Sequence, residues 1–154
     1  MDLITFDRTG FLSNDKTSII AIEDLYLLGI LNSKIADLVI HSISSTKQGG
    51  YFEYKPMYVS QIPIRIIDYS NTNDKVLHDR MVALVDGMLA LHNQLANVRA
   101  GHERTVIQRQ IEATDRQIDN LVYELYGLTE DEIKIVDEAL SPSNIPANLD
   151  PALS

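Results

Sequence analysis

One stretch of the chain, from Thr46 to Tyr58, carries side chains of the types that read DNA. Its lysines can donate to phosphate oxygens, its glutamine amide can bond to a base edge, its tyrosines offer aromatic faces, and its paired glycines let the backbone approach closely. The candidate DNA-binding residues are Lys47, Gln48, Gly49, Gly50, Tyr51 and Lys55. A plain β-turn with exposed lysines explains the same residues, so their spacing alone leaves both interpretations open.

The rest of the sequence offers little for catalytic chemistry. Glu132-Ile133-Lys134 matches half of a metal-dependent nuclease motif, in which carboxylates hold the ion and a lysine orients the attacking water. Thr129 lies three residues before Glu132, however, and this pair is typical of a capping box that opens a helix. The four histidines lack metal-ligand spacing, and there is no phosphate-binding loop or nucleophile motif. We therefore predict no catalytic residue and no metal site.

Two ladders of apolar residues indicate long helices in the second half of the chain. Steps of four and three alternate along each ladder, which places one continuous seam on one helix face, as in a coiled coil. The ladders are Leu77, Met81, Leu84, Met88, Leu91, Leu95 and Val98, and then Ile107, Ile111, Thr114, Ile118, Leu121 and Leu125.

The two ladders do not share a phase. Val98 and Ile107 are nine residues apart rather than seven, and Gly101 lies between them, where glycine weakens or ends a helix. We expect the chain to reverse there and to form an antiparallel helical hairpin over residues 74–126. One unbroken helix over this range would contradict the expectation.

The first part of the chain alternates short apolar runs with turn formers, which is a pattern of short strands. Between them, residues 24–43 carry apolar side chains at helical spacing, and Asn32-Ser33 favours a corner between two short helices as much as one long helix. Extended runs are expected at residues 3–6, 11–12, 17–22, 51–54 and 57–67. The expected fold class is therefore α+β.

The expected organisation has three parts. Residues 1–70 form a small subdomain of short strands plus helices, residues 74–126 form the hairpin, and residues 129–154 form a short capped helix with an extended tail. The polar run from Ser70 to Asn73 separates the first two parts.

Charge and composition limit the partners of this chain. The net charge of -9 argues against an independent nucleic-acid surface and against binding to an anionic membrane. The excess is uneven, because residues 129–154 hold six acids and one base. Between His41 and Arg65 the only acid is Glu53, against Lys47, Lys55 and Arg65, so this is a mildly basic stretch. Cysteine, a charged-then-apolar leader and a long apolar span are all absent, so we expect a cytoplasmic protein with no membrane partner.

Four sequence blocks together resemble a known family. In chain order they read LLGILNSK at residues 27–34, GGYFEYKP at 49–56, QIPI at 61–64 and IDNLVYELYGLT at 118–129. They look like the C-terminal specificity region of bifunctional type IIG restriction-modification enzymes. The layout is also similar to a target-recognition domain plus helical spacer in the specificity subunits of type I systems. The resemblance runs from about residue 3 to residue 139.

This resemblance implies that one part of the longer enzyme recognises DNA and another part performs the chemistry. A mostly β target-recognition domain would read a short sequence in the major groove of double-stranded DNA, while the helices dock it to the methyltransferase/nuclease core of the same polypeptide. That core is similar to adenine-specific DNA methyltransferases that use S-adenosylmethionine and carry an Asn/Asp-Pro-Pro-Tyr/Phe motif, joined to a magnesium-dependent type II endonuclease. This chain has neither the motif nor a cofactor loop. It therefore resembles a non-catalytic fragment without a cofactor of its own.

Other residues of the matching blocks are interpreted as framework. They are expected at a helix corner, at a strand terminus and in aromatic packing at the end of the hairpin. These residues are Leu31, Asn32, Pro63, Tyr123 and Tyr126.

Functions of different classes remain open at this stage. The first is DNA target recognition and docking, with no chemistry in the fragment. The alternative is a protein-interaction module, in which the hairpin seam forms a homodimer or binds a partner helix and has no DNA role. A large apolar patch of unburied seam residues would favour the alternative. A third, an independent nuclease built on Glu132 and Lys134, would require magnesium-dependent cleavage.

Overall fold

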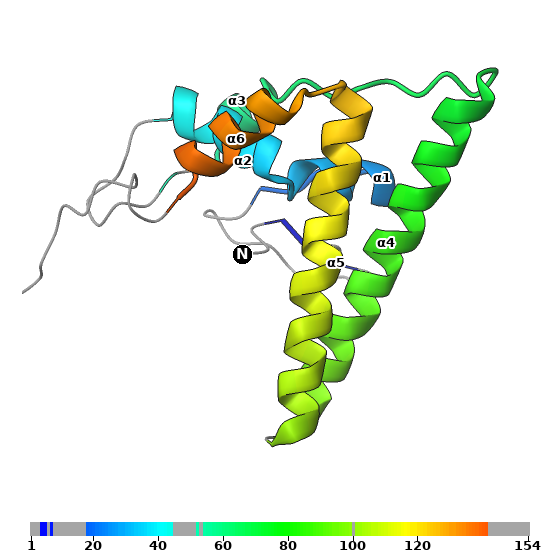
Figure 1. Cartoon of the computed structure of the whole chain (residues 1–154), viewed down its shortest axis with the longest axis vertical. Coiled ribbons are helices and arrows are strands. Elements are labelled where there is room, and N and C mark those ends of the chain that lie inside the picture. Colours follow the sequence, from blue (N-terminus) through cyan, green and yellow to red (C-terminus); the bar gives the residue numbers. More distant parts are fainter. Residues whose placement is uncertain are drawn as a thin grey trace, which may run out of the picture.

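The structure is a computed structural model that describes residues 4, 5, 7, 18–44, 52, 54–99 and 101–141. These residues form short helices beside one long helical hairpin (Figure 1). The helices are α1 (Leu25–Leu31), α2 (Lys34–Ile43), α3 (Pro56–Val59), α4 (Thr72–Asn97), α5 (His102–Tyr126) and α6 (Glu130–Ala139).

The α+β prediction is wrong, because the described residues contain helices and no strand. Residues 56–59 form the helical turn α3 instead of extended chain. Pro56 presets the first helical position, and the N–H groups of Tyr58 and Val59 donate to the carbonyl of Lys55 at 2.9 and 3.0 Å. Residues 18–22 and 63–68 do not pair with another described segment. Apolar β-branched residues favour extended chain, but a strand also needs a neighbour.

Parts of the strand prediction lie outside the described residues. This holds for Leu3 and Phe6, for residues 11–12 and Thr17, and for Tyr51 and Glu53.

The predicted reversal near Gly101 is confirmed. Helices α4 and α5 run antiparallel and pack against each other; they lie close at the Gly101 end and diverge toward the other end, near α1 (Figure 1). Gly101 precedes α5 with φ +102°, in a region that side chains with a Cβ rarely adopt. The Arg104 guanidinium donates to the carbonyls of Leu95 and Val98 at 3.3 and 3.4 Å, which satisfies acceptors at the end of α4.

Helix α1 packs against the hairpin and completes its core. Gly29 permits the contact, because a Cβ added there would lie 2.5 Å from the Met81 sulfur and 2.9 Å from a Val85 methyl carbon. The core consists of Tyr26, Leu28, Ile30, Leu77, Met81, Val85, Met88, Ile118, Leu121, Val122 and Leu125. The apolar seam of both ladders therefore supplies much of one core.

A sharp corner separates α1 from α2, whose axes differ by 55°. Asn32 ends α1 and Ser33 caps α2, so the chain forms two short helices rather than one long helix. The Asn32 amide donates to the carbonyls of Leu28 and Ile4 and accepts the N–H of Ile4 at 3.1 Å. The corner is fixed by this side chain.

Residues after the hairpin adopt the structure that their glycine and capping residues predict. Gly127 ends α5 in the left-handed conformation at φ +66°, and the N–H of Leu128 donates to the carbonyl of Tyr123. Thr129 and Glu132 form the predicted capping box of α6.

Of the described helices, none is by itself long and apolar enough to cross a membrane, although the bent pair α1 and α2 passes this test together.

Candidate nucleic-acid interface

Residues 45–51 are called the candidate segment, and the described residues on both sides of it are attached to one helix. The segment follows α2, which ends at Ile43, and Phe52 stacks on His41 with ring centroids 3.7 Å apart and planes 20° apart. The Tyr54 hydroxyl donates to the carboxylate of Asp37, one turn earlier on α2. The chain thus leaves α2 and returns to α2, so this helix sets where the segment begins and ends.

Burial and charge define the chemistry of these anchors. Burial and the hydrogen bond to Asp37 raise the pKa of Tyr54, which keeps its hydroxyl protonated as a donor. Burial lowers the pKa of His41, so its ring is neutral at pH 7 and adds no positive charge near the segment.

Most of the predicted DNA-binding residues lie outside the described part of the chain. These are Lys47, Gln48, Gly49, Gly50 and Tyr51. Lys55 is described: it is exposed and occupies the position before α3. The assignment of these six residues to DNA stays a prediction.

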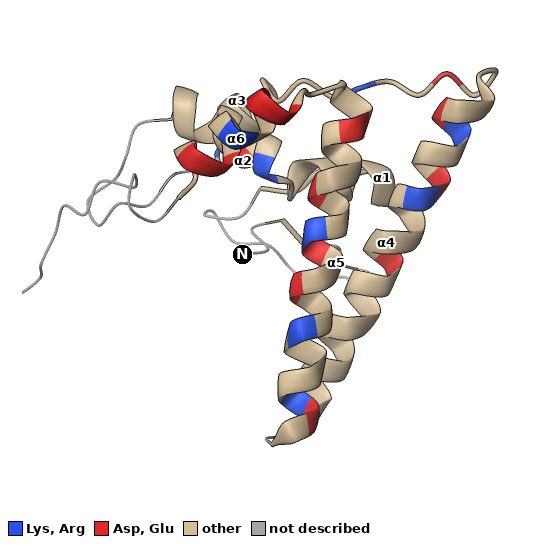
Figure 2. Cartoon of the chain, viewed as in Figure 1, with Lys and Arg blue, Asp and Glu red and all other residues tan. Residues whose placement is uncertain are grey.

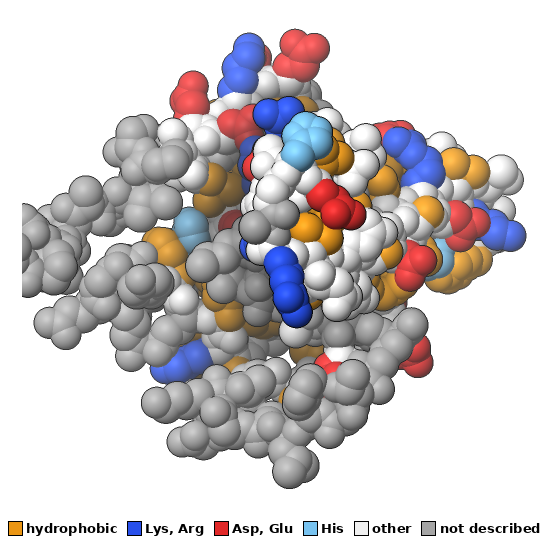
Figure 3. Space-filling model, turned by 90° about the horizontal axis from the view of Figure 1, so that it is seen from below, with side chains coloured by type: hydrophobic (Ala, Val, Ile, Leu, Met, Phe, Trp, Pro, Cys, Tyr) orange, Lys and Arg blue, Asp and Glu red, His pale blue; other side chains and the backbone are white. Residues whose placement is uncertain are grey.

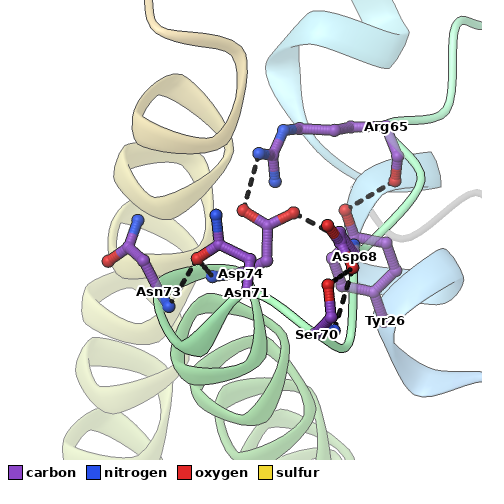
Figure 4. A network of polar contacts seen from close by, with 7 residues as sticks. All are labelled: Tyr26, Arg65, Asp68, Ser70, Asn71, Asn73 and Asp74. Atoms are coloured by element: carbon purple, nitrogen blue, oxygen red, sulfur yellow. Dashed lines mark hydrogen bonds and ion pairs between the residues drawn. The ribbon is translucent and has the colours of Figure 1, made fainter.

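Arg65 does not extend the basic stretch towards solvent. Its Nη2 atom donates to an oxygen of Asp74 at 2.8 Å, while the other oxygen of Asp74 accepts the backbone N–H of Asp68 at 3.1 Å (Figure 4). The Arg65 hydrogen bond holds the pKa of Asp74 below its usual value. Asn71 caps α4 by accepting the N–H groups of Asn73 and Asp74. This network ties the start of α4 to the segment before it.

Two tyrosines fix the connector, defined here as residues 60–71 between α3 and α4. The Tyr26 hydroxyl of α1 donates to the carbonyl of Arg65 at 2.9 Å. The Tyr126 hydroxyl of α5 donates to the carbonyl of Pro63 and accepts the N–H of Arg65 at 3.3 Å. Burial raises the pKa of Tyr26 to about 12, so it remains a donor at neutral pH. The framework interpretation of Pro63 and Tyr126 agrees with these contacts, although no strand ends at Pro63.

A buried carboxylate joins α2 to the hairpin. Asp119 of α5 accepts the N–H of Lys34, the first residue of α2, at 2.9 Å, where the helix dipole favours negative charge. Burial nevertheless raises the pKa of Asp119 to about 6. The Lys34 ammonium donates a hydrogen bond to the carboxylate of Asp137 on α6 at 2.7 Å. Sequence reasoning missed Asp119, because its apolar neighbours indicate only a buried turn of helix.

The described residues contain no group of three or more acidic or histidine side chains able to hold a metal ion. Glu132, from the nuclease-like motif, accepts both the N–H and the hydroxyl of Thr129 at 2.8 Å. These bonds lower the pKa of Glu132. The capping box thus explains Glu132 without catalysis.

The surface of the described part mixes both charges. Acidic residues are frequent on α6, whereas α4 carries no charged side chain from Gly87 to Asn97 (Figure 2). Seen from the hairpin tip, basic and acidic side chains are interspersed (Figure 3). None of the ladder residues is among the exposed large hydrophobic side chains of the described part. Among the described residues, the seam therefore presents no fully exposed large hydrophobic side chain, although Leu91, Leu95 and Val98 are only partly buried.

Comparison with known protein families finds a match for the first part of the chain. Residues 4–64 match the model of a specificity domain, and they include α1, α2 and α3. The matching model describes the TaqI-like C-terminal specificity domain, to which these residues are similar. The match confirms the predicted resemblance to the C-terminal specificity region of a restriction-modification enzyme. No curated protein and no solved structure matches the chain.

Proposed function

We propose that this chain is the DNA-recognition part of a longer restriction-modification enzyme and performs no chemistry itself. The specificity-domain match over residues 4–64 carries the proposal. The parent enzyme would be a type IIG adenine methyltransferase and endonuclease, which brings S-adenosylmethionine and magnesium in its own core.

The anchoring of residues 45–51 supports their role as the DNA-facing segment. Phe52 and Tyr54 bind to His41 and Asp37 on one helix, so the segment emerges from a fixed base. A fixed base reduces the conformational entropy lost when the segment binds a groove. Lys47 and Lys55 would contact phosphates, while Gln48 and Tyr51 would contact bases or sugars.

The hairpin is suited to hold this base at a defined distance from a catalytic core. Helix α4 has 26 residues, which corresponds to about 39 Å of α-helix. Asp119 and the Arg65–Asp74 pair attach α2 and the connector to the hairpin. The hairpin would therefore carry the recognition segment as one body rather than as a flexible attachment.

The net charge of -9 has a specific consequence for this proposal. Lys47 and Lys55 provide only a small part of the electrostatic attraction that DNA binding generally needs. The rest of the enzyme would supply the positive channel, and the isolated chain would bind DNA weakly.

DNA titrations of the longer enzyme test the assignment. Replacing Lys47, Gln48 and Lys55 together by alanine should weaken binding to the target site, with unchanged folding. Because two phosphate contacts would be lost, the slope of log affinity against log salt should fall by about 2.

A matched triple variant controls for the loss of charge. Lys75, Lys134 and Gln117 are exposed residues of the hairpin and α6, and their replacement by alanine should leave site affinity and the salt slope nearly unchanged. Equal effects of both triple variants would contradict the segment assignment. Absence of a longer polypeptide with a methyltransferase core would contradict the proposed function.

A further inference from the structure

Over residues 63–67, the hydrogen bonds that the connector makes with the described part of the chain lie along one edge. Figure 1 shows it as an elongated trace over the helices, and its side chains alternate in exposure, with Ile64 and Ile66 exposed and Arg65 and Ile67 half-buried. The backbone carbonyl and N–H of Arg65 both meet tyrosine hydroxyls, from Tyr26 and Tyr126. Side chains thus occupy the places that a neighbouring strand would fill on this inner edge.

At Ile64 and Ile66, the opposite edge of the connector has no hydrogen-bond partner among the described residues. In extended chain, neighbouring residues direct their N–H and C=O groups to opposite edges, so those of Ile64 and Ile66 point away from the two tyrosines. None of these four backbone groups has a hydrogen bond within the described part of the chain. Four donors and acceptors in this arrangement match one short antiparallel or parallel partner strand.

The residues whose backbone groups face this edge, Ile64 and Ile66, also carry apolar side chains. Ile66 is 89% exposed, more than any other large hydrophobic residue of the described part, and Ile64 is 37% exposed. The only charged side chain between Ile62 and Ile67 is Arg65, which turns inward to Asp74. Edge strands are normally protected by an outward charge or by a covering element, and this edge has no outward charge at its centre.

The small size of this edge indicates what kind of strand could pair with it. Four backbone hydrogen bonds and two isoleucine side chains give a contact far smaller than a stable interface between separate molecules. Such a contact does not offset the freedom that a separate molecule or a second copy loses on binding. A strand on the same polypeptide avoids this cost, because its effective concentration is high.

We propose that residues 63–67 are a sheet edge completed by an extended, apolar strand of the longer polypeptide. The proposal rests on the proposed function, which makes this chain one part of a longer enzyme. The incoming strand would pair with Ile64 and Ile66 and cover their side chains. This pairing would extend the attachment of the recognition part to the rest of the enzyme beyond the hairpin.

Residue-resolved hydrogen exchange on two proteins tests the pairing. In the chain of residues 1–154, the amides of Ile64 and Ile66 should exchange at nearly the unprotected rate, whereas the amide of Arg65 should be protected. In the longer enzyme, the amides of Ile64 and Ile66 should exchange at least 100-fold more slowly. Equal exchange of these two amides in both proteins overturns the proposal, as does protection that rises with the concentration of the isolated chain, which indicates a second copy.

Substitutions provide an independent readout. Ile66→Lys should lower the melting temperature of the longer enzyme and leave that of the isolated chain unchanged. Ile135→Lys is the control, because Ile135 on α6 is also well exposed, at 63%, and it should change neither protein. An Ile66→Lys effect equal in both proteins contradicts the pairing.

DNA binding separates this inference from the proposed function. If the longer enzyme binds its site and leaves the amides of Ile64 and Ile66 unprotected, the strand pairing is wrong and the proposed function stands. If the amides are protected but binding shows no sequence preference, the proposed function is wrong and the pairing stands.

Discussion

Replacing Gly29 by alanine tests the close contact between α1 and α4. The new methyl group would lie 2.5 Å from the Met81 sulfur and 2.9 Å from a branched Val85 carbon. Valine strongly prefers one χ1 rotamer in a helix, so moving that carbon away costs energy. Overpacking of this kind costs about 1–3 kcal/mol. Alanine recovers about 0.8–1 kcal/mol of helix propensity. The expected net loss in free energy of unfolding is therefore about 0–2 kcal/mol, against a gain for an alanine that meets no clash.

Gly87 provides the matched control within the hairpin. It lies inside α4, and a Cβ added there would meet nothing within 4 Å. Gly87→Ala should therefore stabilise the chain by about 0.8–1 kcal/mol through propensity alone. Urea titrations that give the unfolding free energy and its denaturant slope measure both variants. If Gly29→Ala stabilises as much as Gly87→Ala with the same slope, α1 does not approach α4 as closely as described.

Two further perturbations follow from the described contacts. The pKa of Asp119 is raised to about 6 in the folded chain, so its contribution to stability is present below about pH 4 and is lost as pH rises through 6. Asp119→Asn should remove this pH dependence. Its free energy of unfolding relative to the wild type, measured by urea unfolding at each pH, should therefore rise by about 2–3 kcal/mol between pH 4 and pH 7.5. A mutant-to-wild-type difference that is the same at both pH values would contradict the raised pKa. Gly101→Ala should cost about 1–3 kcal/mol of stability because of the φ of +102°, and a neutral effect in thermal unfolding would refute the strained reversal.

The elements that the sequence predicts correctly depend on sequence patterns that span only a few residues. The reversal at Gly101 follows from a break in the heptad phase, and the capping box at Thr129 and Glu132 needs only a spacing of three. The corner at Asn32-Ser33 was predicted as one of two options, since both residues are good caps.

The parts that could not be predicted depend on distant partners. Residues 63–67 have the composition of a strand, but whether they pair is decided outside their own sequence. The bonds from Asp119 to Lys34 and from Asn32 to Ile4 join residues 85 and 28 positions apart. Periodicity indicates that such residues are buried and does not indicate which polar group they meet.

For the candidate site, the sequence predicted residue types but not their support. The aromatic residues after the glycine pair were expected to form a strand, whereas Phe52 and Tyr54 anchor to α2. Arg65 was counted with the basic stretch and instead bonds to Asp74. Both differences arise from tertiary contacts, because a lone aromatic or arginine carries no local signal of its partner.

Mapping adenine methylation in DNA modified by the longer enzyme tests the central proposal most directly. The wild type and the variant with Lys47, Gln48 and Lys55 replaced by alanine should be compared at equal amounts of folded protein. The account predicts that the variant loses methylation at the wild-type sequence or methylates a relaxed sequence. Methylation of the same sequence at the same rate would contradict it.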